Sequence, residues 1–563
     1  MIYHCEDHTC NYWDEGEKLP ERCPQCGRKL LRANEADMTG DDWTALGNTL
    51  WDAEASDKKR MVDCFRKAAY LGSAWGVCNL GICMEQGNGV EADPVQAFWL
   101  YQQAVEMGSL NAVCCLGVCY QYGIGTAPDA KQAAELYCKA AEYGSPRGQM
   151  LLARAFHDGI GVEADAAEAV HWVRAAAYQR YGEGMHRLGV CYEYGDGVEQ
   201  NWERAVHWFR EAAESGVGVA MTDLGYCYEK GCGVEQNWQE AIKWYEQGAQ
   251  CGDLQSMHNL ACCYEGGEGV EQNEDRAFYW YRRSAEGGNG SAMCNLGRCY
   301  KRGYGVEQNW QEAVKWYEQG AQCGNLQSMH NLACCYEHGE GVEQNMTEAI
   351  RWYTAAAEGG NADDMYELGW QYDHGEGVEQ DMKKAICWYE RAAEQNHPAA
   401  MNSLGECYAM GRGVPRDLET AMEWYRRAAE LGEAMADYNM GWHLEQAGKL
   451  SEAYTHYRKA ADGNDDSAWW ALGRFYENGV VVAQDGKEAR RCYETGEKLG
   501  SVKCKMRLAR CKLLGIGGRR AKKAGLDLCR QALELAKESS EKEDYGYEAE
   551  MNLLRRTIAE NES

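Results

Sequence analysis

Four cysteines near the start of the sequence have the spacing of a metal site. Cys23 and Cys26 stand two residues apart, and two thiolates at that spacing can hold one ion, with Gly27 permitting the tight turn beneath it. Cys5 and Cys10 supply a second pair. Few large apolar side chains surround them, and so short a segment folds only when a staple such as zinc holds it. We therefore expect one structural zinc ion bound by these four thiolates; four unbound thiols in a disordered tail are the alternative.

The segment Cys23-Pro24-Gln25-Cys26-Gly27 resembles one knuckle of a zinc ribbon, and Cys10-Asn11-Tyr12 is similar to the end of the other. Cys5 precedes Cys10 by more than the usual two-residue gap, so His8 is an alternative fourth ligand. Zinc ribbons often contact nucleic acid, which leaves open an adaptor that acts on nucleic acid through this module. The acidic residues of the segment argue against that alternative: Glu6, Asp7, Asp14, Glu15, Glu17 and Glu21.

Two further pairs, His258 with Cys262 and His330 with Cys334, have the i, i+4 spacing that places both side chains on one face of a helix. A metal is one interpretation. Each pair lies in a block that occurs twice, at 233–273 and 305–345, so the second pair copies the first, and we interpret both as packing or groove-lining residues. The Gly-x-Gly turns lack the P-loop lysine, and no nucleophile, base and orienter can be named. The sequence therefore predicts a protein that is not an enzyme.

The elements that carry these residues repeat every thirty-six positions. Gly-x-Gly turns recur at that interval from Gly87 to Gly411, each preceded by a Leu-Gly or Leu-Ala pair such as Leu80-Gly81. Weaker repeats around Leu46, Met440, Leu472 and Leu508 bring the number to fourteen. A period of this length is the signature of a solenoid.

Each repeat has the pattern of two helices joined by a glycine turn. Met257, Leu260 and Tyr264 lie on one face of the first helix, which the glycine turn ends. Asn237 followed by Glu240 is a capping signal that begins a second helix. One repeat cannot bury its apolar stripe alone, so neighbouring repeats must stack.

The motifs Leu-Gly-x-Cys-Tyr, Gly-x-Gly-Val, Ala-x-x-Trp-Tyr and Ala-Ala-Glu-x-Gly resemble the Sel-1-like repeat, a longer relative of the tetratricopeptide repeat, over residues 43–540. The resemblance implies an all-α, right-handed α-solenoid of about fourteen helix-turn-helix repeats. The zinc-ribbon-like module (1–32) and a linker (33–42) precede it, and a capping helix (541–563) follows. The repeat around Met440 departs from the family, because it lacks the Gly-x-Gly-Val turn and is four residues short.

Cysteine usage separates this chain from one class of the family. Some secreted Sel-1-like proteins join their repeats by disulfides and have been linked to β-lactam hydrolysis, which makes a hydrolase an alternative function. Cys251 and Cys323 occupy the first bridge position, but methionine or similar residues stand at the second. With no signal peptide and no apolar run long enough to span a membrane, we expect a reduced, cytoplasmic protein. One cysteine row is expected to pack in the core: Cys83, Cys119, Cys191, Cys227, Cys263, Cys299, Cys335 and Cys407.

Charge restricts the partners. The chain carries 58 basic and 88 acidic residues, a net charge of −30. This excess argues against general affinity for nucleic acid or for anionic membranes, both of which need a basic face. It suits a cationic partner, and it also suits simple solubility.

In tetratricopeptide-like arrays the first helices line the concave surface, and the residue five after the conserved Leu points inward. That residue is often acidic here, as in Glu229, Glu265 and Glu337, and a second acidic row lies in the turns, as at Glu91. The rows are either solvated surface or an anionic strip that steers a basic segment of another protein to the groove.

An asparagine precedes the conserved position at Asn259, Asn295, Asn331 and Asn439. In related peptide-binding modules such an amide bonds the backbone of an extended ligand; packing between helices is the alternative. Aromatic anchors complete the predicted docking zone on the concave face: Tyr366, Trp370, Tyr438, Trp442 and Trp470. The sequence thus predicts a scaffold that holds a basic or extended segment of a partner protein.

Overall fold

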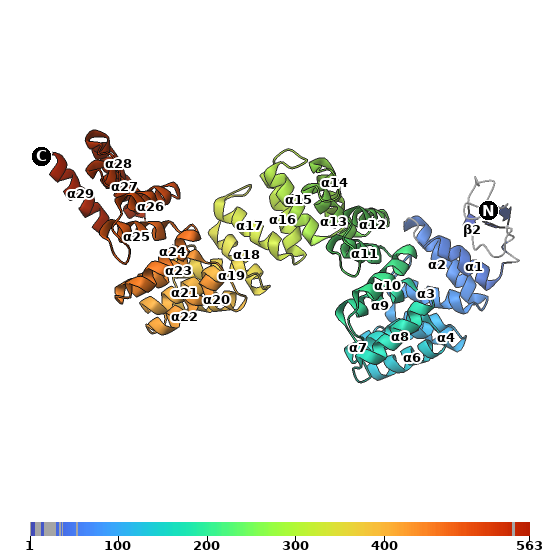
Figure 1. The fold of residues 1–563 in the computed structure, drawn as a ribbon. Coiled ribbons are helices and arrows are strands. Elements are labelled where there is room, and N and C mark those ends of the chain that lie inside the picture. The colour runs from blue at the N-terminus through green and yellow to red at the C-terminus, as the bar shows by residue number, and fades with distance from the viewer. Residues whose placement is uncertain are drawn as a thin grey trace. The chain divides into compact units, whose positions relative to one another are not determined.

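The computed structural model describes residues 2–5, 13–15, 30–32, 35, 38–51, 55–542 and 547–562 (Figure 1). Three short strands come first, β1 (Ile2–Cys5), β2 (Trp13–Glu15) and β3 (Leu30–Arg32), in the antiparallel order β2-β1-β3. Of the predicted zinc ligands, Cys10, Cys23, Cys26 and the alternative His8 lie outside the described residues. Cys5 ends β1, but its side chain is not described. The zinc site therefore stays a prediction.

The rest of the described chain is helical, which confirms the predicted all-α solenoid. It forms fourteen antiparallel helix pairs and one last helix, α29 (Glu548–Glu562). The first helices of the pairs are α1 (Gly40–Thr49), α3 (Ala74–Gln86), α5 (Leu110–Tyr122), α7 (Pro146–Asp158), α9 (Gly182–Tyr194), α11 (Gly218–Lys230), α13 (Leu254–Gly266), α15 (Gly290–Arg302), α17 (Leu326–His338), α19 (Ala362–His374), α21 (Pro398–Met410), α23 (Ala434–Gln446), α25 (Asp466–Asn478) and α27 (Val502–Leu514). The second helices are α2 (Ala55–Tyr70), α4 (Pro94–Glu106), α6 (Ala130–Glu142), α8 (Ala166–Tyr178), α10 (Trp202–Glu214), α12 (Trp238–Gln250), α14 (Glu274–Glu286), α16 (Trp310–Gln322), α18 (Met346–Glu358), α20 (Met382–Glu394), α22 (Leu418–Glu430), α24 (Leu450–Asp462), α26 (Gly486–Lys498) and α28 (Lys522–Lys542).

The chain divides into two compact units. The first comprises residues 1–292 and 304–306, and the second comprises residues 293–303 and 307–563. From α1 to α13 and from α16 to α28, each helix packs on the helix that follows it in the chain (Figure 1). No helix among the described residues is both long and apolar enough to cross a bilayer.

Caps and glycines set the length of each helix. The Asn237 side chain accepts hydrogen bonds from the backbone N–H groups of Gln239 and Glu240, as the capping signal predicted. At the other end, Gly231 closes α11 with φ +73°, in the left-handed region that favours glycine. Two residues later Gly233 has φ +69°, and a Cβ there would lie 2.4 Å from the backbone of Trp202. The second turn glycine is therefore needed for the close contact between consecutive repeats.

An aromatic ring fills the centre of almost every repeat. The ring of Tyr101, from the second helix, packs against Gly81, which follows the conserved Leu of the first helix. Twelve of the thirteen pairs from α1–α2 to α25–α26 bury a ring completely at this position: Phe65, Tyr101, Tyr137, Phe209, Tyr245, Tyr281, Tyr317, Tyr353, Tyr389, Tyr425, Tyr457 and Tyr493. The exception is the α7–α8 pair, where Val173 takes the place of the ring.

The predicted cysteine row packs beside these rings, and every member of it is buried and outside any disulfide. Burial raises the pKa of Cys83 and Cys191 to about 11 and that of Cys227 to about 12. Cys251 and Cys323, at the first bridge position of the secreted class, are exposed free thiols. These cysteines behave as small core residues rather than as covalent links.

The C-terminal segment forms the last helix. Met551 and Leu554 of α29 are buried with Met506 of α27 and Cys529 of α28. This packing covers apolar side chains of α27 and α28.

Candidate functional site

The predicted acidic row is occupied by the array's own tyrosines. In each of three repeats, the hydroxyl of the central tyrosine donates a hydrogen bond to the carboxylate five residues after the conserved Leu. The bonds run from Tyr245 to Glu229 at 2.8 Å, from Tyr281 to Glu265 at 2.7 Å and from Tyr353 to Glu337 at 2.6 Å. The Glu229 side chain is only 17% exposed. These carboxylates have a structural contact, and their role in binding a partner stays a prediction.

The other acidic row, in the turns, faces solvent. Every member is exposed: Glu91, Glu163, Glu199, Glu235, Glu271, Glu307, Glu343 and Glu379. These exposed carboxylates can attract an approaching cation, although at about 0.1 M salt the attraction is largely screened beyond about 10 Å.

Two members of the asparagine row connect neighbouring first helices. Asn331 of α17 donates to the Cys294 sulfur of α15 at 3.3 Å, and Asn439 of α23 donates to Asn402 of α21 at 3.0 Å. Asn259 accepts from Gln255 one turn earlier at 2.8 Å, and Asn295 has the same register on α15. For Asn331 and Asn439 these contacts favour the alternative of an amide that packs helices together.

The predicted aromatic anchors lie on α19, α23 and α25 of the second unit. Tyr366 is half-buried and stacks on His397 with ring centroids 4.9 Å apart. Trp370 stacks on His374 at 4.4 Å. Trp442 is the most open of the five, with 44% of its surface exposed. Burial raises the pKa of Tyr438 to about 12.

Trp470 already has an intramolecular partner. Its indole N–H donates to Glu550 of α29 at 3.3 Å, and the guanidinium of Arg474 lies 4.6 Å from its ring. Glu550 also pairs with Arg507 of α27 at 2.7 Å. The last helix therefore occupies the C-terminal end of the predicted docking zone.

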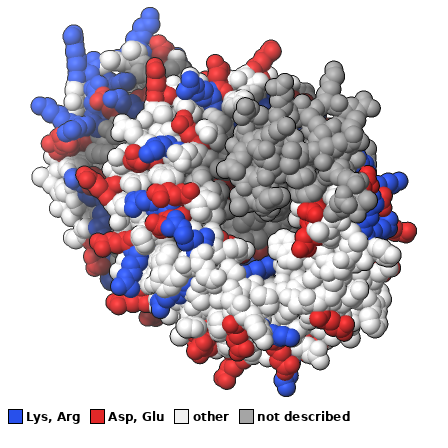
Figure 2. Space-filling model, turned by 90° about the vertical axis from the view of Figure 1, so that its right-hand side faces the viewer, with Lys and Arg blue, Asp and Glu red and all other residues white. Residues whose placement is uncertain are grey.

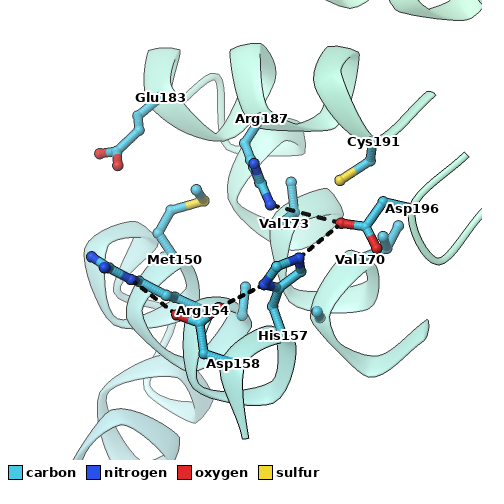
Figure 3. A pocket seen from close by; sticks show the side chains of 12 residues that line it. Met150, Arg154, His157, Asp158, Val170, Val173, Glu183, Arg187, Cys191 and Asp196 are labelled. Carbon is cyan, nitrogen blue, oxygen red and sulfur yellow. Dashed lines mark hydrogen bonds and ion pairs between the residues drawn. The ribbon is translucent and has the colours of Figure 1, made fainter. Parts of the chain in front are cut away.

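A pocket of about 350 Å³ lies between α7 and α9, with α8 behind it (Figure 3). It lies in the one repeat among the first thirteen that lacks a central ring, and Val173 is part of its wall. The other apolar wall residues are Met150, Ala153, Ala169 and Val170. A missing ring thus leaves a space of the size that small ligands use.

Charged side chains surround His157 in this pocket (Figure 3). His157 Nδ1 lies 2.7 Å from Asp158 Oδ1, and its Nε2 lies 3.3 Å from Asp196 Oδ2. Arg154 pairs with Asp158 at 3.3 Å, and Arg187 pairs with Asp196 at 3.7 Å. The hydrogen bond from His157, together with the Arg154 guanidinium, lowers the pKa of the Asp158 carboxyl. The pocket therefore has an apolar base and a rim of hydrogen-bonding side chains that carry both positive and negative charges.

The thiol that lines this pocket is not an activated nucleophile. Cys191 lines the pocket as a buried thiol with a pKa of about 11, well above that of a reactive cysteine. No three His, Cys, Asp or Glu side chains of the described residues are grouped as a metal site would require.

The second histidine–cysteine pair forms a cation–carboxylate contact. His330 Nδ1 lies 2.8 Å from the buried Asp364, and its Nε2 lies 3.6 Å from Cys334. The hydrogen bond with Asp364, and then that with Cys334, raises the pKa of His330 to about 10, while burial raises the pKa of the Asp364 carboxyl. The earlier copy has Ala292 where this one has Asp364.

The sequence reasoning missed the pocket, although a signal was present. Aligning the repeats by their conserved Leu places an aromatic residue in one column of every strong repeat except at Val173. In the same repeat, His157 replaces the acidic residue found five after the conserved Leu in most others.

The repeats of this chain match those of known proteins. The family model described as Sel1 repeat matches residues 76–109, 112–145, 146–181, 182–217, 218–253, 254–289, 290–325, 326–361, 362–397, 398–433, 434–465 and 468–501. The search of curated proteins finds no match. Among solved structures, c5321 of uropathogenic Escherichia coli, titled a protective antigen displaying an SLR fold, is 28% identical. The match covers 76% of this chain and 94% of that one, with a TM-score of 0.55. A Sel1 repeat protein from Oxalobacter formigenes is 31% identical over 43% of this chain and 96% of its own, with a TM-score of 0.40.

Proposed function

Because the chain belongs to the Sel1 repeat family, as its motifs predicted, we propose that it is a protein-interaction scaffold. The surface formed by the first helices holds an extended segment of a partner protein. Stacked helix pairs present one continuous row of first-helix side chains within each unit, and such rows are the binding surfaces of repeat proteins. One observation carries the proposal: half-buried and exposed aromatic side chains follow one another on the first helices α19 and α23.

The arrangement of these rings suits an anchor site. Trp370 stacks on His374 with ring centroids 4.4 Å apart, and Trp442 meets His443 edge-on at 4.8 Å, so both indoles are in contact with a neighbouring ring before a partner arrives. Rigid aromatic side chains lose little entropy on binding, and aromatic residues are enriched among the energetic hot spots of interfaces.

Charge supports a partner with basic residues. The net charge is −30, and the acidic row in the turns is exposed. Figure 2 shows Lys and Arg side chains interspersed with Asp and Glu on the visible face, so the acidic excess does not make that face uniformly negative. Steering by the exposed row speeds association with a basic segment, and the effect weakens as salt is added.

The thiols support a reducing compartment. No disulfide joins the cysteines whose side chains the structure describes, including those that are exposed. Persistent free thiols are typical of cytosolic proteins, which supports the cytoplasmic location that the composition suggested. Neither a hydrolase nor a nucleic-acid adaptor gains an observation from the described residues.

The test is affinity purification from the native cell with mass spectrometry, using the wild type, a Trp370→Ala/Trp442→Ala variant and a Trp99→Ala control. Trp99 is 66% exposed on α4, the second helix of its repeat. It is therefore a tryptophan like Trp370 and Trp442 but lies outside the surface of the first helices. We expect the control to retain the wild-type partner and the double variant to lose it. Equal recovery by the double variant would remove these rings from the function.

A further inference from the structure

The complete repeats show what would fill the pocket between α7 and α9. In the α3–α4 repeat, the Tyr101 ring lies against Gly81 and its hydroxyl donates to Glu85 at 2.6 Å. Cys78 and Cys115 belong to the same buried cluster as this tyrosine. These residues together surround one phenol group.

The pocket is built from the corresponding positions two repeats later. A shift of seventy-two residues converts Gly81, Glu85, Cys78, Cys115 and Tyr101 into Ala153, His157, Met150, Arg187 and Val173. All five of the shifted residues line the pocket. The pocket is therefore the tyrosine site of a repeat whose tyrosine is absent (Figure 3).

We infer that this pocket binds a tyrosine side chain of a protein partner, whose ring takes the place that Val173 leaves open. The inference rests on the proposed function, because the pocket lies between two first helices, α7 and α9, and the first helices form the surface on which the partner is proposed to bind. The apolar residues Ala153, Ala169 and Val170 receive the ring, and a buried aromatic side chain removes about 150–250 Å² from water.

The polar rim distinguishes tyrosine from phenylalanine. In the complete repeat the hydroxyl ends at Glu85, and the corresponding residue here is His157. Its two ring nitrogens are held by Asp158 and Asp196, so a hydroxyl that reaches this point meets carboxylate acceptors, as it does in the other repeats. The Arg154 guanidinium, also in the wall, adds a cation that aromatic faces attract.

Alanine at position 153 does not prevent a ring from fitting. Ala261 and Ala333 occupy the same register in two other repeats, and both repeats bury a tyrosine completely, Tyr281 and Tyr353. An intrinsic tyrosine at 173 should therefore also fold, which supplies the test.

The experiment measures binding of N-acetyl-L-tyrosinamide to the full-length protein by ligand-observed NMR and calorimetry. We expect the wild type to bind it, and Val173→Tyr, which fills the pocket from within, to weaken binding by about tenfold or more. Phe209→Tyr adds the same hydroxyl to a repeat that already has its ring, so this control should bind as the wild type does. Val173→Phe fills the pocket in the way that Phe209 fills its own repeat, and it serves if the tyrosine variant is poorly folded.

Three results would overturn the inference. Undiminished binding by both filled variants would place the ligand elsewhere. N-acetyl-L-phenylalaninamide binding as tightly as the tyrosine amide would remove the role of the hydroxyl. Binding of free p-cresol without binding of the tyrosine amide would identify a small phenol, not a polypeptide, as the occupant. None of these outcomes depends on Trp370 or Trp442, so the scaffold proposal is tested separately.

Discussion

The contact between the central tyrosine and its carboxylate makes a quantitative prediction in the α3–α4 repeat. Tyr101 is fully buried, and its hydroxyl donates to Glu85 at 2.6 Å. Glu85→Ala removes that acceptor, and a buried donor without its acceptor costs about 1–3 kcal/mol. Glu85→Gln keeps an acceptor oxygen and should cost less, about 0.5–1 kcal/mol.

Tyr101→Phe completes the set. It removes only the hydroxyl, and phenylalanine is the natural residue at Phe65 and Phe209, so the expected loss is about 0.5–1.5 kcal/mol. If the two groups act through one hydrogen bond, the double variant Tyr101→Phe/Glu85→Ala should lose about 1 kcal/mol less than the sum of the single variants.

Hydrogen exchange read by mass spectrometry on peptides from α3 and α4 is the suitable assay. A repeat array opens locally, so a single unfolding midpoint does not report on one repeat. Glu91→Ala, in the exposed turn row, is the matched control and should leave the exchange of these helices unchanged. Fully additive losses in the double variant would refute the reasoning, as would a Glu85→Ala exchange rate equal to that of the control.

The remaining predictions concern the turn, the half-buried His330 and the N-terminal cysteines. Gly233→Ala should destabilise α10–α12 by about 1–3 kcal/mol, because its Cβ would lie 2.4 Å from the Trp202 backbone at a positive φ. The control Gly252→Ala, also at a positive φ but with nothing within 4 Å of the added Cβ, should cost about 1 kcal/mol. Equal hydrogen-exchange rates in the two variants would count against the contact between Gly233 and Trp202. The folded-state pKa of His330 is about 10, above an unfolded value near 6.5, so its contribution is complete below about pH 6.5 and disappears as pH rises through about 10. Amide hydrogen exchange in α17 and α19, corrected for its intrinsic pH dependence, should therefore increase between about pH 6.5 and 10 in the wild type but not in His330→Gln. A parallel increase in both proteins would contradict the assignment of this pH dependence to His330. Metal analysis of the full-length protein should find about one zinc per chain and markedly less in Cys23→Ser/Cys26→Ser, whereas a wild type with less than about half an equivalent would reject the zinc site.

The hydrogen bonds from the central tyrosines to the first acidic row also change how the two acidic rows should be tested. Charge reversal at Glu229, Glu265 and Glu337 would remove acceptors from tyrosine hydroxyls as well as charge from the surface. A lost partner would then be ambiguous between weaker steering and a disturbed fold. Reversal in the exposed turn row, for example at Glu235 and Glu271, tests steering alone.

The sequence by itself determined the repeat length, the helix pairs and their ends. A thirty-six-residue period, an asparagine or aspartate cap such as Asn237 and paired turn glycines such as Gly231 and Gly233 act within one repeat or between immediate neighbours. Local signals of that kind can be read from spacing because backbone geometry leaves few alternatives. The cysteine row was predictable for the same reason, since its period places it on the buried face.

Only the tertiary structure decided what the side chains on the first helices do. The spacing places Glu229 on that face, but the hydroxyl that reaches it belongs to Tyr245 on the next helix. Likewise, Trp470 looks like an open anchor until α29 folds back and Glu550 accepts its N–H. The pocket at Val173 arises from atoms that are missing where three helices meet. Contacts between side chains on different helices depend on distances of a few ångströms, which a one-dimensional pattern does not contain.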